Sequence, residues 1–276
     1  MSGFFASEVM RSALLPAILI AVTASSISVM VLAHRLSFLT VGVSHATLAG
    51  LGLAVTFSLP LLPTASATAV AVALLLAPML WKRGLNEDAA TGVLFAGAMA
   101  LGIVLISRAN RYEVDLFGLL FGNILIVSDA DRHWLILAAG IIMLCFLWGA
   151  RGWWSIAFDA PAAAASGLPV TFYRMLLYAV TGLTVVMCVK LAGIVLTTGL
   201  LVLPAACAWF WGKGLGWLWL LSLLFSVTGT LIGLMISYAE DWPSGATVVL
   251  TLCMMFLISW GGAQLVQNRT SRNHST

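Results

Sequence analysis

The chain has 276 residues, of which 62% are hydrophobic and only 8% are charged, and its net charge is +3 at pH 7. A soluble domain carries about 25% charged residues, so this composition excludes a water-soluble protein and indicates a membrane protein. The small net charge is spread over loops, which excludes a nucleic-acid-binding surface, and the four cysteines lie in apolar segments without disulfide or zinc spacing.

Charged and turn residues divide the sequence into apolar segments that predict eight or nine transmembrane helices, because about 20 apolar residues cross a bilayer. In chain order, the expected spans are residues 12–33, 41–59, 64–81, 89–107, 133–148, 173–189, 192–211, 217–238 and 244–262. The 13 residues 116–128 are too few to cross and predict a short re-entrant helix. We expect one all-α, polytopic membrane domain over residues 1–265 and a disordered polar tail at 266–276.

Positive charge indicates the orientation in the membrane. The more basic of the two sets of alternate loops contains His34, Arg35, Lys82, Arg83, Arg151, Lys213, Arg269 and Arg272. The other set, to which Lys190 is assigned, is diluted by carboxylates. Because cytoplasmic loops carry the excess of lysine and arginine, residues 151–172 and the tail are expected in the cytoplasm. The side of the N-terminus depends on whether eight or nine spans form, which stays open.

His45 lies in a stretch that has no charged residue from Val41 to Leu80. An ionisable side chain inside a membrane segment is costly unless it has a polar partner, a water-lined path or a ligand, and it indicates a functional site. The alternative is an imidazole that hydrogen-bonds a backbone carbonyl between helices. On the same helix, Gly42, Ala46 and Gly50 form a stripe of small residues where a second helix can approach closely.

Carboxylates near the expected outer membrane surface are further candidates. Asp115 precedes the short segment 116–128, and Glu240 and Asp241 precede the sequence WPSG at 242–245. Carboxylates with an imidazole suit a divalent transition ion such as zinc, manganese or ferrous iron, and they would form a path from the outer mouth into the membrane. The alternative is that Asp115 and Asp241 cap or orient helix N-termini.

Catalytic motifs are absent from the sequence. It has no HExxH or GxSxG pattern and no two carboxylates in one membrane segment, so we do not expect an enzyme. It also has no GxxxxGK[ST] phosphate loop, so any transport driven by ATP requires another polypeptide.

Four sequence blocks resemble the membrane permeases of the bacterial metal-ion ABC importers, the zinc, manganese and iron type. In the order expected for that family, the blocks are RLSFLTVGVSHATLAGLGL (35–53), YEVDLFGLLFGNILIVS (112–128), FDAPAAAASGLPV (158–170) with VKLAGIVLTTGLLVLPAACA (189–208), and SYAEDWPSGATVVL (237–250). Together they cover nearly the whole chain, which is far more specific than any single motif.

The resemblance implies a type II ABC importer fold, similar to the vitamin B12 permease, in a bacterial inner-membrane permease that works as a dimer. It implies a cytoplasmic ATPase that hydrolyses ATP, and an extracytoplasmic metal-binding protein. We expect two identical permease chains, with two different chains as the alternative. The coupling element that docks on the ATPase would be residues 157–171, including Asp159, Ala163 and Gly167, and Pro204 in the longest block is assigned to helix packing.

One position departs from the family pattern. Members commonly have an aspartate one helical turn before the histidine, and this chain has Val41 there. Either His45 holds the ion more weakly, with Ser44 or a residue from another helix, or the cargo differs. The divalent ion is expected as transported substrate, with no permanently bound cofactor, and which metal is carried stays open. The alternative functions are a permease for a metal chelate such as a siderophore, and an ATP-independent metal carrier.

Overall fold

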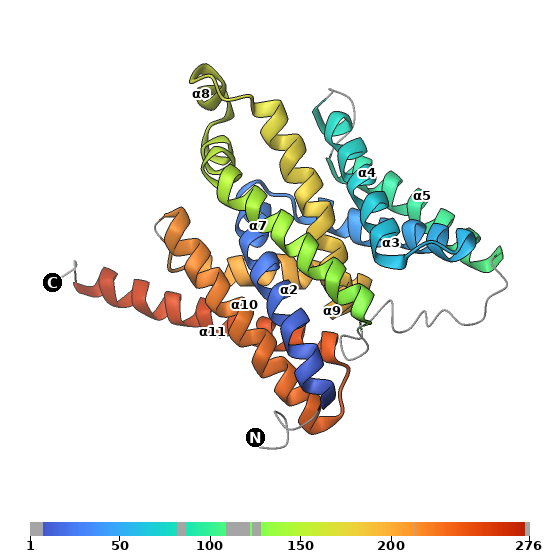
Figure 1. The fold of residues 1–276 in the computed structure, drawn as a ribbon. Coiled ribbons are helices and arrows are strands. Elements are labelled where there is room, and N and C mark those ends of the chain that lie inside the picture. The colour runs from blue at the N-terminus through green and yellow to red at the C-terminus, as the bar shows by residue number, and fades with distance from the viewer. Residues whose placement is uncertain (1–7, 82–86, 109–121, 123–127, 213, 274–276) are drawn as a thin grey trace.

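The computed structural model describes residues 8–81, 87–108, 122, 128–212 and 214–273. The regular structure within these ranges is entirely helical (Figure 1). In chain order the helices are α2 (Glu8–Ala33), α3 (Ser37–Phe57), α4 (Leu61–Trp81), α5 (Glu87–Arg108), α7 (Asp129–Phe158), α8 (Ala160–Ala165), α9 (Val170–Trp209), α10 (Leu215–Glu240) and α11 (Ser244–Asn273).

Seven helices in this part of the chain are long and apolar enough to cross a membrane, namely α2, α3, α5, α7, α9, α10 and α11. Helix α4 is apolar as well, with no charged residue among its 21 residues. The all-α, polytopic membrane fold predicted from the sequence is therefore confirmed, with a helix count near the expected eight or nine. The short helix expected at 116–128 lies outside the described residues except for Gly122 and Ser128.

Helix α9 contains the two expected spans 173–189 and 192–211, joined across the non-helical residue Gly193. The sequence assigned Lys190 to a loop between spans 173–189 and 192–211, but the helix continues through Lys190 and bends sharply at Gly193, where φ is 78° and ψ is 171°. The break between the two spans therefore lies at Gly193 instead of at Lys190, and Lys190 stays helical because its charge is paired within the bundle. Its Nζ lies 3.0 Å from Asp131 Oδ2 at the start of α7. A positive φ is accessible mainly to glycine, which explains the place of the bend.

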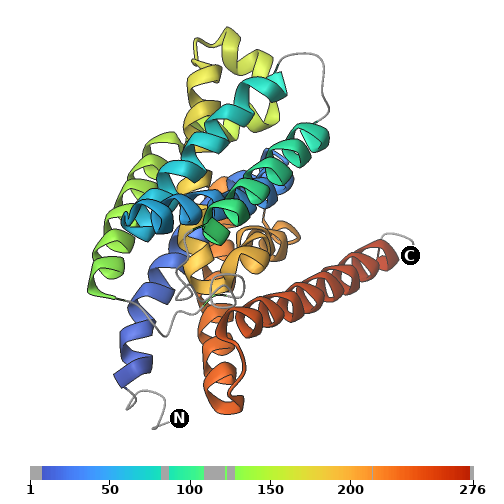
Figure 2. The same ribbon diagram turned by 90° about the vertical axis from the view of Figure 1, so that its right-hand side faces the viewer.

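Helix α2 is central and packs against α7, α9 and α10. Its contact with α10 is partly polar, since Ser222 Oγ donates to Ser25 O (3.1 Å) and Ser226 Oγ donates to Ala21 O (2.8 Å). Helices α3, α4 and α5 form a second group on one side, joined to the rest through α9 (Figures 1 and 2). Within a bilayer, interhelical hydrogen bonds and close contacts replace the hydrophobic effect as the forces that hold helices together.

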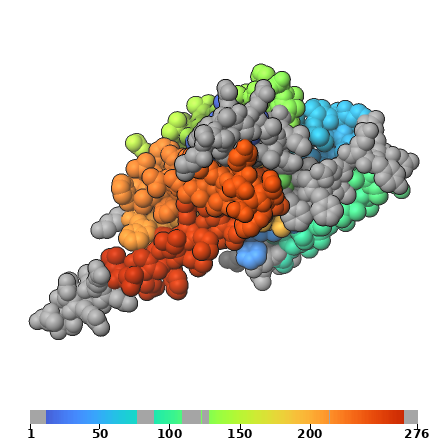
Figure 3. Space-filling view, turned by 90° about the horizontal axis from the view of Figure 1, so that it is seen from below, coloured from blue at the N-terminus to red at the C-terminus, as the bar shows by residue number. Residues whose placement is uncertain are grey.

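The C-terminal helix extends beyond the bundle (Figure 2). Helices α10 and α11 pack side by side at one end of the molecule (Figure 3). The C-terminal part of α11 then projects away from the other helices (Figure 2). It extends as a helix to Asn273, which includes most of the tail for which disorder is predicted.

Candidate functional site

Helix α3 positions His45 inside the group formed with α4 and α5. The imidazole is half-buried, and its Nδ1 lies 3.0 Å from Val41 O one turn earlier on the same helix. In the tautomer that donates from Nδ1 to this carbonyl, the lone pair is on Nε2, as in metal-ligating histidines. The backbone bond thus satisfies one ring nitrogen and orients the ring, while leaving the other nitrogen able to bind a cation.

An aromatic ring from α5 lies against His45. The centroids of His45 and Phe95 are 4.7 Å apart, with an interplanar angle of 78°. Ser44 is buried, and its Oγ donates to Val41 O at 2.9 Å and lies 3.3 Å from His45 Nδ1. The Ser44 hydroxyl is therefore committed mainly to its own helix. Sequence reasoning missed Phe95, because nothing in the residues around it signals a neighbour 50 positions earlier in the chain.

The outer carboxylates occupy a different part of the molecule. Glu240 and Asp241 are both exposed at the end of α10, and Asp241 has φ 53° with its backbone N–H bonded to Ser237 O. Asp241 therefore closes α10 instead of opening α11. Helix α3 packs on α4, α5 and α9, whereas α10 packs on α2, α9 and α11.

These candidate ligands do not converge on one another. Among the residues that the structure describes, no three His, Cys, Asp or Glu side chains lie together as a metal-binding group. Asp115 lies outside the described residues.

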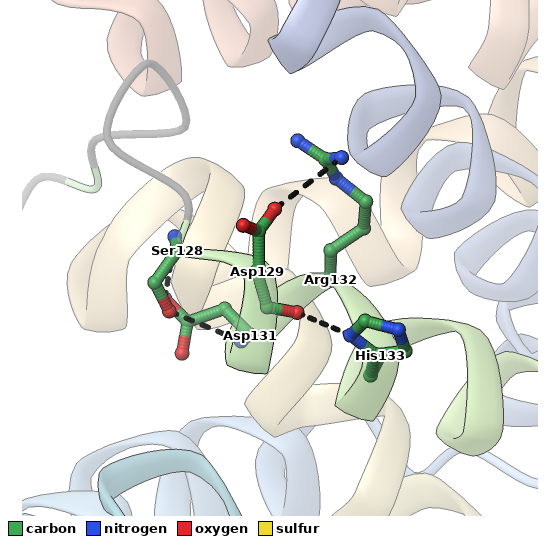
Figure 4. Close-up of polar contacts among 5 residues, drawn as sticks. All are labelled: Ser128, Asp129, Asp131, Arg132 and His133. Carbon is green, nitrogen blue, oxygen red and sulfur yellow. Dashed lines mark hydrogen bonds and ion pairs between the residues drawn. The ribbon is translucent and has the colours of Figure 1, made fainter.

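A polar cluster that the sequence reasoning did not identify lies where α7 begins (Figure 4). Ser128 and Asp131 form a capping box, in which each side chain accepts from the other residue's backbone N–H. His133 Nδ1 lies 2.7 Å from Asp129 O, and Arg132 pairs with Asp129 at 3.5 Å. Asp131 also pairs with Lys190, so the cluster ties the start of α7 to the helix just before the α9 bend. The sequence signal for this pair was Lys190 itself, because a lysine within an apolar stretch needs a partner of opposite charge.

Small residues determine how closely α3 approaches its neighbours. A Cβ on Gly42 would lie 2.6 Å from Thr91 Cγ2 of α5, and a Cβ on Gly50 would lie 2.7 Å from Ala65 Cα of α4. Ala46, between them, is fully buried. These contacts are too short for any larger side chain, so His45 is carried by a helix with little freedom to shift sideways.

Pro204 lies inside the second half of α9 and is buried. Its neighbour Ala205 donates its backbone N–H to Ser28 Oγ of α2 at 3.1 Å. Since proline cannot continue the helical hydrogen-bond ladder, this contact helps to hold the helix against α2 at that point.

The expected coupling element forms a helical hairpin at one end of the molecule (Figure 1). Asp159 ends α7 and caps α8, because its Oδ1 accepts from Ala162 N–H at 2.9 Å. Ala163 is buried, and Gly167 forms the turn into α9 with φ 88°. Most of α8 is exposed.

Trp153 braces this hairpin against the bundle. Its side chain is fully buried, and its Nε1 donates to Tyr173 O of α9 at 2.7 Å. Its own carbonyl lies 2.8 Å from Nε2 of His34, in the turn between α2 and α3. Burial lowers the pKa of His34 below 6.5, against the opposing effect of the Trp153 carbonyl, and the positive charge of Arg174 lowers it further.

We expect this histidine to make stability depend on pH. The unfolded chain binds the His34 proton more tightly than the folded protein does, so the stability that neutral His34 provides above pH 6.5 is lost as the pH falls below it. His34→Gln retains a donor but does not titrate, so its thermal midpoint should change less between pH 8 and pH 5.5. The control His133→Gln, at an exposed histidine, should retain the wild-type pH dependence. Identical pH dependence in all three proteins would contradict this assignment.

The chain matches a known family and known structures over most of its length. The family described as "ABC 3 transport family" matches residues 6–262. The manganese import system permease protein ScaB of Streptococcus gordonii is 31% identical over 259 residues, which cover 91% of this chain and 90% of that protein. The manganese transport system membrane protein MntC of Halalkalibacterium halodurans is 31% identical over 252 residues, which cover 91% of this chain and 86% of that protein. The solved structure of PsaBC from Streptococcus pneumoniae, in complex with Fab, superposes with a TM-score of 0.85 at 29% identity, covering 94% of this chain and 93% of that one.

Proposed function

Because the chain belongs to the ABC 3 transport family, we propose that it is the permease subunit of an ATP-driven importer of a divalent transition-metal ion. Manganese is the ion we favour over zinc and iron, because relatives aligned over nine-tenths of the chain are named as manganese permeases. Transport proceeds by alternating access at the centre of a dimer of permeases, which we take to be two copies of this chain.

The observation that carries the proposal is the setting of His45. In the tautomer in which Nδ1 donates to Val41 O, the lone pair of Nε2 is available to bind a cation, on a helix that has no charged residue. With valine in place of a carboxylate at position 41, the imidazole is a weak ligand with Ser44 beside it. A weak site suits transport, because the ion must leave as readily as it enters.

The remaining roles follow the direction of import. Asp115, Glu240 and Asp241 receive the ion at the outer mouth from an extracytoplasmic metal-binding protein. On the cytoplasmic side, the exposed α8, capped by Asp159, enters a groove of the ATPase, which supplies the energy from ATP. Ala163 and Gly167 fix the position of α8 relative to α9.

Deleting this gene from its host provides the test of substrate class. Uptake of radioactive manganese, zinc and ferrous iron is measured in the deletion strain and in a strain complemented with the wild-type gene. We expect manganese uptake to fall in the deletion strain and to return on complementation. Unchanged uptake of all three ions would contradict a metal-importing role, and loss of zinc or iron uptake alone would contradict the choice of manganese.

Replacing Val41 with aspartate tests the weak-ligand interpretation. The new carboxylate would lie one turn from the imidazole, and Val41 is only half-buried, so we expect manganese to bind about tenfold more tightly. Tighter binding should slow release and lower the maximal uptake rate. In the matched variant Val41→Asn, the side chain has nearly the same shape as aspartate but no charge. This variant should leave the manganese affinity and the maximal uptake rate close to wild type. Equal manganese affinity in wild type and Val41→Asp would contradict the role of position 41.

A further inference from the structure

A cavity of about 620 Å³ lies between the C-terminal half of α7 and the first turn of α10, and none of the residues that line it belongs to α3, the helix that carries His45. Its lining includes Arg151, Trp154 and Ser155 from α7 and Gly216 and Trp219 from α10. Figure 1 shows the start of α10 beside this part of α7. Arg151 lies two turns before the end of α7, next to the hairpin that its positive charge and the family resemblance place in the cytoplasm, so we take the cavity to lie at the level of the cytoplasmic leaflet.

The polar side of the cavity is suited to a phosphate group. The Arg151 side chain is exposed, and Ser155 adjoins it with its Oγ bonded to Arg151 O at 3.0 Å. Helix α10 starts at the cavity wall after Gly214, which provides no side-chain cap. The backbone N–H groups of its first turn have no partner within the helix and add to the positive potential that Arg151 creates.

The apolar side of the cavity is rigid. Phe146 and Trp219 stack across the gap between α7 and α10, with centroids 6.0 Å apart. The indole N–H of Trp219 donates to Ser26 Oγ of α2 at 2.9 Å, which fixes the ring from behind. Tryptophans at this level are typical of the membrane–water interface.

The cavity opens along exposed apolar side chains on both helices. On α7, Leu147 lines the cavity and Leu144 continues one turn toward the membrane centre, and both are 70% exposed. On α10, Leu220 and Leu224 follow Gly216 at intervals of one turn and are 46% and 56% exposed. An occupant could therefore place a charged group beside Arg151 and hydrocarbon against these leucines.

We propose that this cavity binds an anionic phospholipid of the cytoplasmic leaflet. Its phosphate pairs with the Arg151 guanidinium and the first-turn N–H groups of α10, its glycerol region lies against Trp154 and Trp219, and its acyl chains follow the exposed leucines. Basic pockets between transmembrane helices on the cytoplasmic side bind anionic headgroups in this way. A zwitterionic choline headgroup would bring a second positive charge toward Arg151 and is disfavoured. This site is independent of the transported ion.

Lipid retention by the purified complex tests the proposal. The permease is purified in detergent with its ATPase, incubated with dioleoyl phosphatidylglycerol or dioleoyl phosphatidylcholine, and examined by native mass spectrometry. We expect wild type to retain phosphatidylglycerol and Arg151→Gln to retain about fivefold less. The matched variant Arg132→Gln, at the opposite end of the same helix, should retain as much as wild type. Equal retention of both lipids by wild type would overturn the proposal.

A second variant tests the cavity without changing its charge. A Cβ added to Gly216 meets no atom within 4 Å, so Gly216→Leu should fold normally and place its side chain in the cavity. We expect it to lose phosphatidylglycerol, whereas Gly140→Leu, at an equally open position on α7 outside the cavity, should not. Wild-type retention in both Arg151→Gln and Gly216→Leu would overturn the proposal. Displacement of the lipid by millimolar inorganic phosphate would overturn it as well, because the occupant would then be a soluble anion.

Discussion

Replacing His45 with alanine is expected to lower manganese uptake by about tenfold or more, while the protein still reaches the membrane and assembles with its partners. The variant removes the Nε2 ligand and also the edge-on contact with Phe95 of α5, but the hydrogen bonds that the structure shows for the ring are confined to Val41 O and Ser44 of its own helix, so we expect the helix to stay intact. Even the groups that merely orient metal ligands are worth about 10- to 100-fold in affinity. Uptake of radioactive manganese into cells, normalised to the amount of permease in the membrane, provides the measurement.

His133→Ala is the matched control for this variant. His133 makes the same kind of contact, Nδ1 to a backbone oxygen four residues earlier (Asp129 O, 2.7 Å), but it is exposed at the start of α7. We expect its uptake to equal that of wild type. Normal uptake in His45→Ala, or equal losses in the two variants, would remove His45 from the path of the ion.

Replacing Gly167 with valine is expected to separate ATP hydrolysis from transport. With φ at 88°, this position favours glycine, and a β-branched residue there costs about 1–3 kcal/mol of backbone strain. A Cβ at Gly167 would meet no atom within 4 Å, so the substitution causes no steric clash. It acts instead by changing the backbone conformation of the turn between α8 and α9. Relief of that strain would reorient α8 on the ATPase, and we expect manganese uptake per ATP hydrolysed to fall about tenfold.

The rate of manganese uptake and the rate of ATP hydrolysis are measured on the same proteoliposomes, which contain permease and ATPase. Gly140→Val is the control, because that glycine is exposed on α7, is equally free of neighbouring atoms and lies far from the hairpin in sequence. It should retain the wild-type ratio of uptake to hydrolysis. A wild-type ratio in Gly167→Val would contradict the assignment of α8 as the coupling element.

The helices could be predicted from the sequence mainly because uncharged apolar runs of about 20 residues are typical of transmembrane helices. The membrane fold and the resemblance to metal-ion ABC importer permeases, which rested on four short blocks, are both confirmed by the matches over most of the chain. The two spans within α9 could be predicted in this way, but the place of the break between them could not. Lys190 indicates a loop when read locally, and only its pairing with Asp131, 59 residues away, makes it tolerable inside a helix.

The candidate site was only partly accessible from the sequence. An isolated histidine in an uncharged segment can be recognised from the sequence, whereas Asp159 was a candidate only through the family resemblance, and its capping of α8 is visible only in the structure. The edge-on contact of His45 with Phe95 depends on how α3 and α5 approach each other, which no local pattern encodes. That Glu240 and Asp241 lie on one path with His45 stays a prediction, because α10 and α3 both pack on α9 but are not among the helix pairs that pack on each other.

Manganese uptake into proteoliposomes that contain the permease and its ATPase, with the extracytoplasmic metal-binding protein on the outside and ATP enclosed, is the decisive measurement. We expect radioactive manganese to accumulate against its gradient only when ATP is enclosed and both partner proteins are present, and to accumulate far less with His45→Ala. Accumulation that is equally fast without ATP, or that needs only this chain and an ion gradient, would contradict an ATP-driven import mechanism.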